Sequence, residues 1–173
     1  KAKAVVPGET KRVRWASTPV VRQNKHRVPR MKDNRTIDAD WNKAAWKHVT
    51  PVTLEYYMAE EPSHQPKTQV RTAYDDKALY LLWKVEDNYV RAKCTKHQQD
   101  VCRDSCVEFF FTPRGDPAER GYFNLETNCT GVKLFGIHIP ESSGKRLSAD
   151  EYASITTATS LTDPIESEIE MST

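Results

Sequence analysis

The chain has 173 residues, of which 38% are hydrophobic and 29% are charged. That length fits one domain, and the composition indicates a thin core beneath a well-solvated surface. The 26 Lys and Arg residues nearly balance the 24 Asp and Glu residues, which argues against a nucleic-acid partner. The longest apolar run, Ala78 to Trp83, is far shorter than the roughly 20 residues of a membrane-spanning helix, so we expect no membrane partner.

Positive charge is concentrated at the start of the chain. Eleven of the 26 cationic residues lie within 1–35, together with three prolines. This stretch lacks sustained periodicity, which predicts a solvated basic arm over 1–36 ahead of one folded domain over 37–173. The only helical candidate follows, over 41–48, where Asp38 or Asp40 is placed to cap the first amide groups. We expect at least one of its two tryptophans to fill the end of the domain.

Alternation of apolar and polar residues dominates the chain from Thr68 onward, and it is typical of half-buried strands. The predicted fold is therefore all-β: an antiparallel two-sheet sandwich, jelly-roll or immunoglobulin-like, with at most one or two short helices. The predicted strands are 68–74, 78–85, 105–112, 122–128, 132–139 and 153–160.

One predicted strand has an unusually polar second face. In 122–128, Phe123 and Leu125 point to one side, whereas Asn124 and Glu126 point to the other. Glu108 lies in the same way opposite its apolar neighbours in 105–112. If these two strands are neighbours, Glu108, Asn124 and Glu126 share one polar surface.

The four cysteines, Cys94, Cys102, Cys106 and Cys129, show neither a CxxC pair nor zinc-site spacing. Metal bound by cysteine is therefore not expected. A disulfide between Cys94 and Cys102 and free buried thiols both remain open. The five histidines are scattered, with no metal-ligand spacing.

Four segments in order carry a family resemblance. They are IDADW at 37–41 with AW at 45–46, AYDD at 73–76 with ALY at 78–80, VED at 85–87, and DSCVEFF at 104–110. Together they resemble the carbohydrate-binding modules of family nine. HQPKT at 64–68 and GYFN at 121–124 resemble one branch of that family.

The resemblance implies a non-catalytic β-sandwich that binds a plant-type oligosaccharide or polysaccharide and takes part in carbohydrate catabolism. It also implies a secreted or periplasmic location, a linked glycoside hydrolase as partner, and often a structural calcium ion. Calcium needs about six to eight oxygen ligands, and no contiguous loop of this chain offers them. Any such site would be assembled from distant segments.

Sugar recognition needs acceptors and forked donors for hydroxyls and an aromatic plate for the C–H face. Glu108 resembles a family carboxylate that accepts sugar hydroxyls, and Asn124 lies where some members place another polar ligand. Tyr89 and Arg91, in a predicted loop after Asp87, are expected to close over this surface. The predicted carbohydrate-binding residues are Tyr89, Arg91, Asp104, Glu108, Asn124 and Glu126.

The sequence departs from the family at two places. Cys102 occupies the position where members with a sugar clamp usually carry a tryptophan, so one stacking plate is missing. The family also continues into further strands beyond the region that matches 165–169. We therefore expect a module without its last strands.

Three other functions stay open. A glycoside hydrolase would use two of Asp104, Glu108 and Glu126 as its carboxylates. A haem-binding sandwich would use Met58 and His138 as axial ligands. The third alternative is a structural module of a larger secreted protein, whose sugar site has degenerated with the loss at Cys102.

Overall fold

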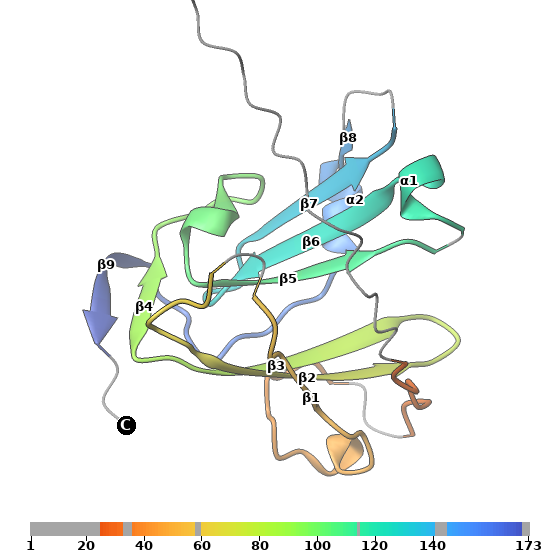
Figure 1. Ribbon diagram of the computed structural model, residues 1–173, viewed down its shortest axis with the longest axis horizontal. Coiled ribbons are helices and arrows are strands. Elements are labelled where there is room, and N and C mark those ends of the chain that lie inside the picture. Colours follow the sequence, from red (N-terminus) through yellow and green to blue (C-terminus); the bar gives the residue numbers. More distant parts are fainter. Residues whose placement is uncertain (1–24, 33–35, 58–59, 114, 141–144, 171–173) are drawn as a thin grey trace, which may run out of the picture.

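The computed structural model describes residues 25–32, 36–57, 60–113, 115–140 and 145–170, and it is built almost entirely of strands (Figure 1). The strands are β1 (Val52–Thr53), β2 (Lys67–Tyr74), β3 (Leu79–Glu86), β4 (Tyr89–Ala92), β5 (Cys106–Phe111), β6 (Tyr122–Asn128), β7 (Lys133–His138), β8 (Lys145–Arg146) and β9 (Ile165–Glu170). The short helical segments are the 3-10 turns η1 (Ala44–Trp46) and η2 (Val101–Arg103) and the α-helices α1 (Pro117–Arg120) and α2 (Ala149–Ala153).

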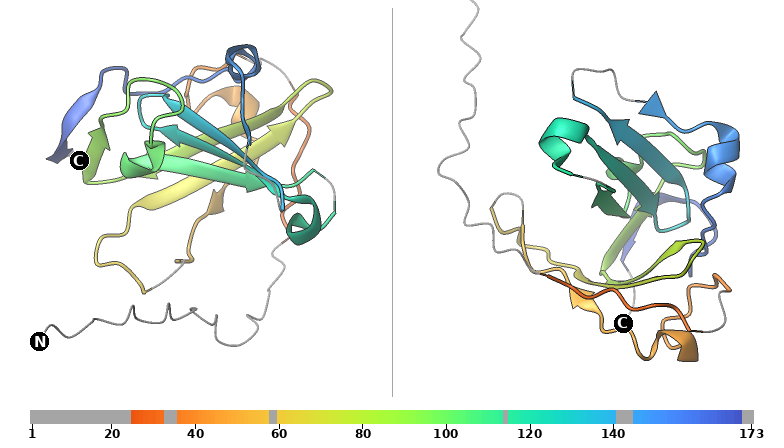
Figure 2. Two further views of the ribbon diagram at one scale, coloured as in Figure 1. Left: turned by 90° about the horizontal axis from the view of Figure 1, so that it is seen from above. Right: turned by 90° about the vertical axis from the view of Figure 1, so that its right-hand side faces the viewer.

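Two antiparallel sheets form the layers of a sandwich. One sheet has the order β1-β2-β3 and the other the order β5-β6-β7-β8, while β4 pairs with β9 at one end. Figures 1 and 2 show the two main sheets stacked one above the other. The predicted all-β sandwich is confirmed, and five of the six predicted strands match β2, β3, β5, β6 and β7 within about one residue.

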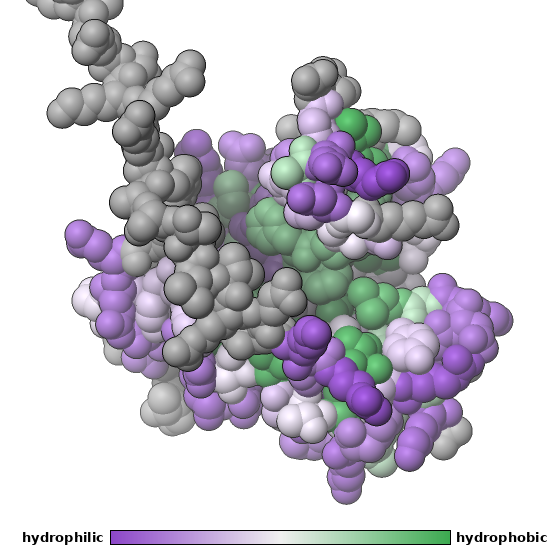
Figure 3. Space-filling model, turned by 45° about the vertical axis from the view of Figure 1, so that its right-hand side comes forward, coloured by the Kyte–Doolittle hydropathy of each residue, from purple (hydrophilic) through white to green (hydrophobic). Residues whose placement is uncertain are grey.

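Phenylalanines fill the space between the layers. Phe111 stacks on Phe109 and on Phe123, with ring centroids 5.2 and 5.1 Å apart, and Phe135 packs edge-on against Phe111. Of these four rings only Phe135 is buried, at 8% exposed, and the other three are half-buried. Figure 3 accordingly shows apolar side chains at the surface between the two sheets. This apolar face turns inward, so the polar face of β5 and β6 is directed away from the β1-β2-β3 layer.

A second cluster lies beneath the β1-β2-β3 sheet in the view of Figure 1, where Met31 and Trp46 are buried against Ala73 and Leu82. Met31 is held there because its amide donates to the Tyr74 carbonyl at 2.7 Å. The part of the predicted arm that the structure describes, 25–32, therefore packs onto the domain, which begins before residue 37. Residues 1–24 lie outside the described residues.

The predicted helix over 41–48 is only the single turn η1. Its N-cap residue, Lys43, makes no side-chain cap bond. Asp38 and Asp40 instead accept from the amides of Asp40 and Asn42, at 3.2 and 2.8 Å, which is ordinary Asx-turn chemistry. Both aspartates thus stabilise turns before η1 and cap no helix.

The predicted strand over 153–160 is wrong. Helix α2 ends there, and 154–164 has no regular structure. Ser148 and Glu151 form a capping box, in which the Ser148 amide donates to Glu151 Oε2 at 2.7 Å and the Glu151 amide donates to Ser148 Oγ at 3.3 Å. That S-x-x-E signal was present in the sequence, but the β-branched residues that follow it favoured a strand.

Candidate functional site

The outer face of β5 and β6 carries the predicted polar surface. The two strands are neighbours, and their register places Glu108 opposite Glu126 and Phe110 opposite Asn124. Directly opposed residues of antiparallel strands have Cβ atoms about 4.5–5.5 Å apart. The structure therefore brings together Glu108, Asn124 and Glu126, which we call the polar row.

Asn124 is the centre of the polar row and is 6% exposed. Its Nδ2 donates to Glu126 Oε1 at 3.0 Å and to Glu108 Oε2 at 3.4 Å. Asn124 Oδ1 and Glu126 Oε2 are buried and have no hydrogen-bond partner among the described residues. A buried acceptor without a donor costs about 1–3 kcal/mol, so both oxygens favour a ligand that brings hydroxyl donors.

The surroundings of Glu126 raise the pKa of its carboxyl group. Burial raises the pKa of Glu126, and the neighbouring charge of Glu108 raises it further. The Cys102 backbone amide and the Asn124 side chain oppose this increase in pKa. Two facing carboxylates with one amide between them thus form a site that gains from a donor-rich ligand.

Turn η2 bounds the Glu126 end of the row, because it packs on both β5 and β6 and the Cys102 backbone lies near the Glu126 carboxylate. Cys102, the residue at the family's tryptophan position, is itself exposed. The backbone of Cys102 therefore borders the polar row, although its side chain offers no aromatic ring for stacking.

Asp104 has a structural role in the interior. Its oxygens accept from the amides of Lys93 and Cys94, both at 2.9 Å, and from Asn128 Nδ2 at 3.0 Å. Although burial raises its pKa, these hydrogen bonds outweigh that effect and the pKa of Asp104 lies below its ordinary value. Asp104 therefore fixes the loop after β4 to the end of β6.

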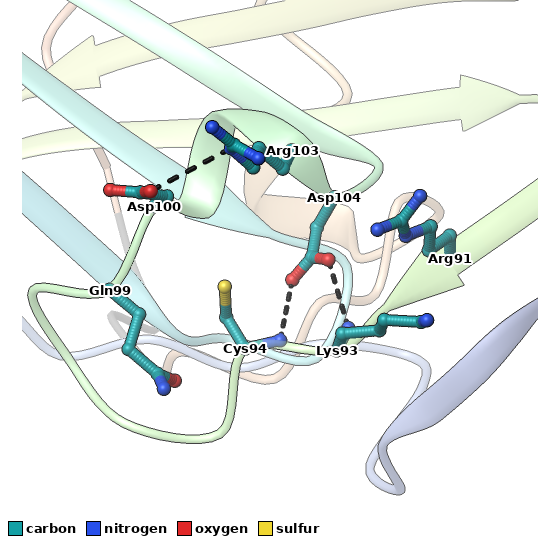
Figure 4. Close-up of a pocket in the computed structure, with 7 residues that line it drawn as sticks. All are labelled: Arg91, Lys93, Cys94, Gln99, Asp100, Arg103 and Asp104. Carbon is teal, nitrogen blue, oxygen red and sulfur yellow. Dashed lines mark hydrogen bonds and ion pairs between the residues drawn. The ribbon is translucent and has the colours of Figure 1, made fainter.

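A pocket of about 430 Å³ opens between β4 and η2, and Asp104 lies on its wall (Figure 4). Three cations line it, Arg91, Lys93 and Arg103, together with Asp100, which pairs with Arg103 at 3.6 Å. The buried Arg91 Nε has no hydrogen-bond partner among the described residues. Arg91 thus brings an unpaired donor to the wall of this pocket, which shares turn η2 with the polar row.

Tyr89 and Arg91 lie in strand β4, which corrects the predicted loop. Tyr89 pairs with Glu170 of β9, and its ring contacts His64 edge-on at 5.1 Å. His64 in turn hydrogen-bonds Asp87 at 2.7 Å. The structure joins Tyr89 to this group, and no contact in the described residues brings it to the polar row.

The four cysteines are free thiols. Burial, followed by the charge of Glu108, raises the pKa of Cys106 to about 12, which keeps it in the unreactive thiol form. The described residues contain no cluster of three or more His, Cys, Asp or Glu placed to hold a metal. We assign no calcium ligands, and calcium binding stays a prediction.

Met58 and His138 were the two possible axial ligands of a haem group. His138 stacks on Tyr122, and Met58 lies outside the described residues. Phe110, Tyr122 and His138 form a row of aromatic rings beside the polar row, which the sequence reasoning missed.

No helix among the described residues is long and apolar enough to cross a bilayer.

An acceptor-rich row on a sheet face is chemically suited to the hydroxyl groups of a sugar. The chain belongs to carbohydrate-binding family 9, whose model matches residues 33–172. The fold is similar to the crystal structure of a candidate carbohydrate-binding protein from Bacteroides uniformis, with a TM-score of 0.72 and 23% identity. The match covers 83% of this chain and 65% of that chain. The search of curated proteins gave no match.

Proposed function

We propose that this carbohydrate-binding domain is a non-catalytic module for a plant-type oligosaccharide or polysaccharide, and that Glu108, Asn124 and Glu126 bind its hydroxyl groups. The observation that carries the proposal is the pair of partnerless buried acceptors, Asn124 Oδ1 and Glu126 Oε2. A sugar presents several hydroxyl donors close together, so one bound residue can satisfy both oxygens once the side chains that cover them move aside. Arg91 adds a charged donor from the neighbouring pocket.

The arrangement of the carboxylates favours binding over hydrolysis. Glycosidases place their two carboxyl groups on either side of the scissile bond. Glu108 and Glu126 instead lie side by side on one sheet face and share the Asn124 amide. A bound sugar would therefore meet both carboxylates from the same side.

Family membership also supports a cellular role. We propose that the module is secreted or periplasmic, acts in carbohydrate catabolism, and holds a linked glycoside hydrolase close to its polysaccharide. Attachment of this kind increases the local substrate concentration without any change in the hydrolase itself. We further propose a structural role for calcium.

Calorimetric titration with xylo-, cello- and manno-oligosaccharides tests the proposal, with Glu108→Gln as the site variant. This substitution keeps the shape and removes the charge, and we expect at least tenfold weaker binding, equivalent to about 1.4 kcal/mol. Glu55→Gln, an exposed glutamate after β1, is the matched control and should bind like wild type.

Circular dichroism and thermal melting confirm that each variant is folded. An absence of heat with every sugar, or equal affinity for wild type and Glu108→Gln, would overturn the proposal. Release of reducing sugar that depends on Glu108 and Glu126 would identify a hydrolase instead.

A further inference from the structure

Three aromatic rings from three neighbouring strands form a continuous row on the outer face. Tyr122 of β6 stacks on His138 of β7, with centroids 4.5 Å apart and planes 15° apart, and Phe110 of β5 lies 5.9 Å from Tyr122. We call this group the aromatic row. It is open to solvent, because Phe110 is 56% exposed and His138 is also exposed.

Gly136 leaves space for the His138 ring in this row. Gly136 precedes His138 by two residues on β7, so both lie on the same face. A Cβ on Gly136 would meet His138 Nε2 at 2.9 Å, closer than real Cβ contacts allow. The imidazole therefore leans over the bare backbone of Gly136, and this position lets it stack on Tyr122.

The aromatic row continues the polar row directly. Phe110 is the register partner of Asn124, and Gly136 is the partner of Asn124 on the other side. Tyr122 precedes Asn124 by two residues on the same face, a separation of about 7 Å at the usual rise of a strand. No described element separates the two rows.

The opposite end of the polar row is closed, since η2 packs there against β5 and β6. A ligand anchored on Asn124 and Glu126 can therefore extend away from η2 along this face, past Phe110. Phe110, on the end strand β5, is 56% exposed, and its ring lies beside Tyr122, which in turn stacks on His138. A plate that is held in place in advance binds at a lower entropic cost.

We infer that the aromatic row is a second sugar subsite: Phe110 stacks against the C–H face of the residue that follows the one held by Glu108 and Asn124. The inference rests on the proposed function. Phe110 would provide an aromatic plate on the sheet itself. The family pattern places its aromatic plate at the position of Cys102 instead. The preferred ligand is consequently an oligosaccharide of at least two residues rather than a single sugar.

The test compares a monosaccharide with its disaccharide and trisaccharide, titrated calorimetrically into the full chain. Wild type should bind the disaccharide about tenfold more tightly than the monosaccharide, which corresponds to one stacking contact. Phe110→Ala should lose this gain and bind the monosaccharide within about twofold of wild type. Phe110→Tyr, unlike Phe110→Ala, should keep the gain, because it keeps an aromatic plate at this position.

Tyr56→Ala is the control, because Tyr56 is a 76% exposed aromatic that follows β1 in the other sheet. Equal affinity of wild type for one and two sugar residues, or an unchanged gain in Phe110→Ala, would overturn the second subsite. In that case binding that still depends on Glu108 would leave the proposed function intact. If no sugar binds to wild type, both the proposed function and the second subsite fail.

Discussion

Asp104 and Asn128 are joined by a hydrogen bond of 3.0 Å between their buried side chains. Asn128 Oδ1 also accepts from the Val132 amide at 2.8 Å. The pair therefore connects the loop after β4, the end of β6 and the start of β7. These are the segments that border the pocket and the polar row.

Asp104→Ala should strongly destabilise the domain and leave no specific defect in the polar row. The substitution leaves the amides of Lys93 and Cys94 without an acceptor, and hydrogen bonds to a charged group contribute about 1.5–3 kcal/mol each. We expect a loss of about 3 kcal/mol in the free energy of unfolding, measured by urea titration. Asp100→Ala, in an exposed ion pair, should lose less than about 1 kcal/mol. Equal losses would contradict the structural role of Asp104.

The contribution of Asp104 should also depend on pH. Its pKa is lowered in the folded state, so its stabilisation is present above the unfolded pKa of about 3.9 and is lost as pH falls through the folded pKa. The difference in unfolding free energy between wild type and Asp104→Ala should therefore be largest near neutral pH and shrink in acid. A difference that stays constant with pH would contradict this assignment.

Glu126 should show the opposite pH dependence. Its folded pKa is raised, so the stability that it contributes is present below its unfolded pKa and is lost as pH rises through the folded pKa. Glu126→Gln should melt a few degrees above wild type at neutral pH, and the difference should disappear below about pH 4. Sugar binding should weaken at the same time, a trade of function for stability.

Thermal melts at several pH values measure this effect, with Glu55→Gln as the control that should follow wild type throughout. A lower melting temperature for Glu126→Gln at neutral pH would show that the carboxylate stabilises the fold. It would also show that the polar row is not strained in the absence of ligand.

The sequence predicted the main strands and the polar row because both depend on local alternation. Glu108, Asn124 and Glu126 follow from period two once β5 and β6 are taken as neighbours. The strand β4 was missed because it is short and its partner, β9, lies more than 70 residues further along the chain. No local pattern reveals such a distant pair.

The aromatic row and the role of Asp104 could not be predicted for a related reason. Phe110, Tyr122 and His138 become neighbours only through the register of three strands. Asp104 accepts from the backbone amides of Lys93 and Cys94, and their approach depends on how the loop folds back. Sequence patterns indicate which residues share a face, but not which backbone amides a carboxylate will reach.

Lys133 anchors the segment that follows α2. It is 6% exposed, and its Nζ donates to the Ile155 carbonyl at 2.6 Å and to Thr157 Oγ1 at 3.1 Å. Lys133→Met keeps most of the side-chain volume but removes the donor, so the Ile155 carbonyl loses this partner. We expect a loss of about 1–3 kcal/mol in the free energy of unfolding, with faster proteolysis within 154–164.

Lys47→Met, at an exposed lysine, is the matched control and should change the free energy of unfolding by less than about 0.5 kcal/mol. Mass spectrometry of the first cleavage products locates the nicks. If Lys133→Met is cut no faster than Lys47→Met within 154–164, the segment is held by something other than Lys133. The helix α2 would then be the stronger anchor, because the Phe135 amide donates to Tyr152 Oη at 2.7 Å.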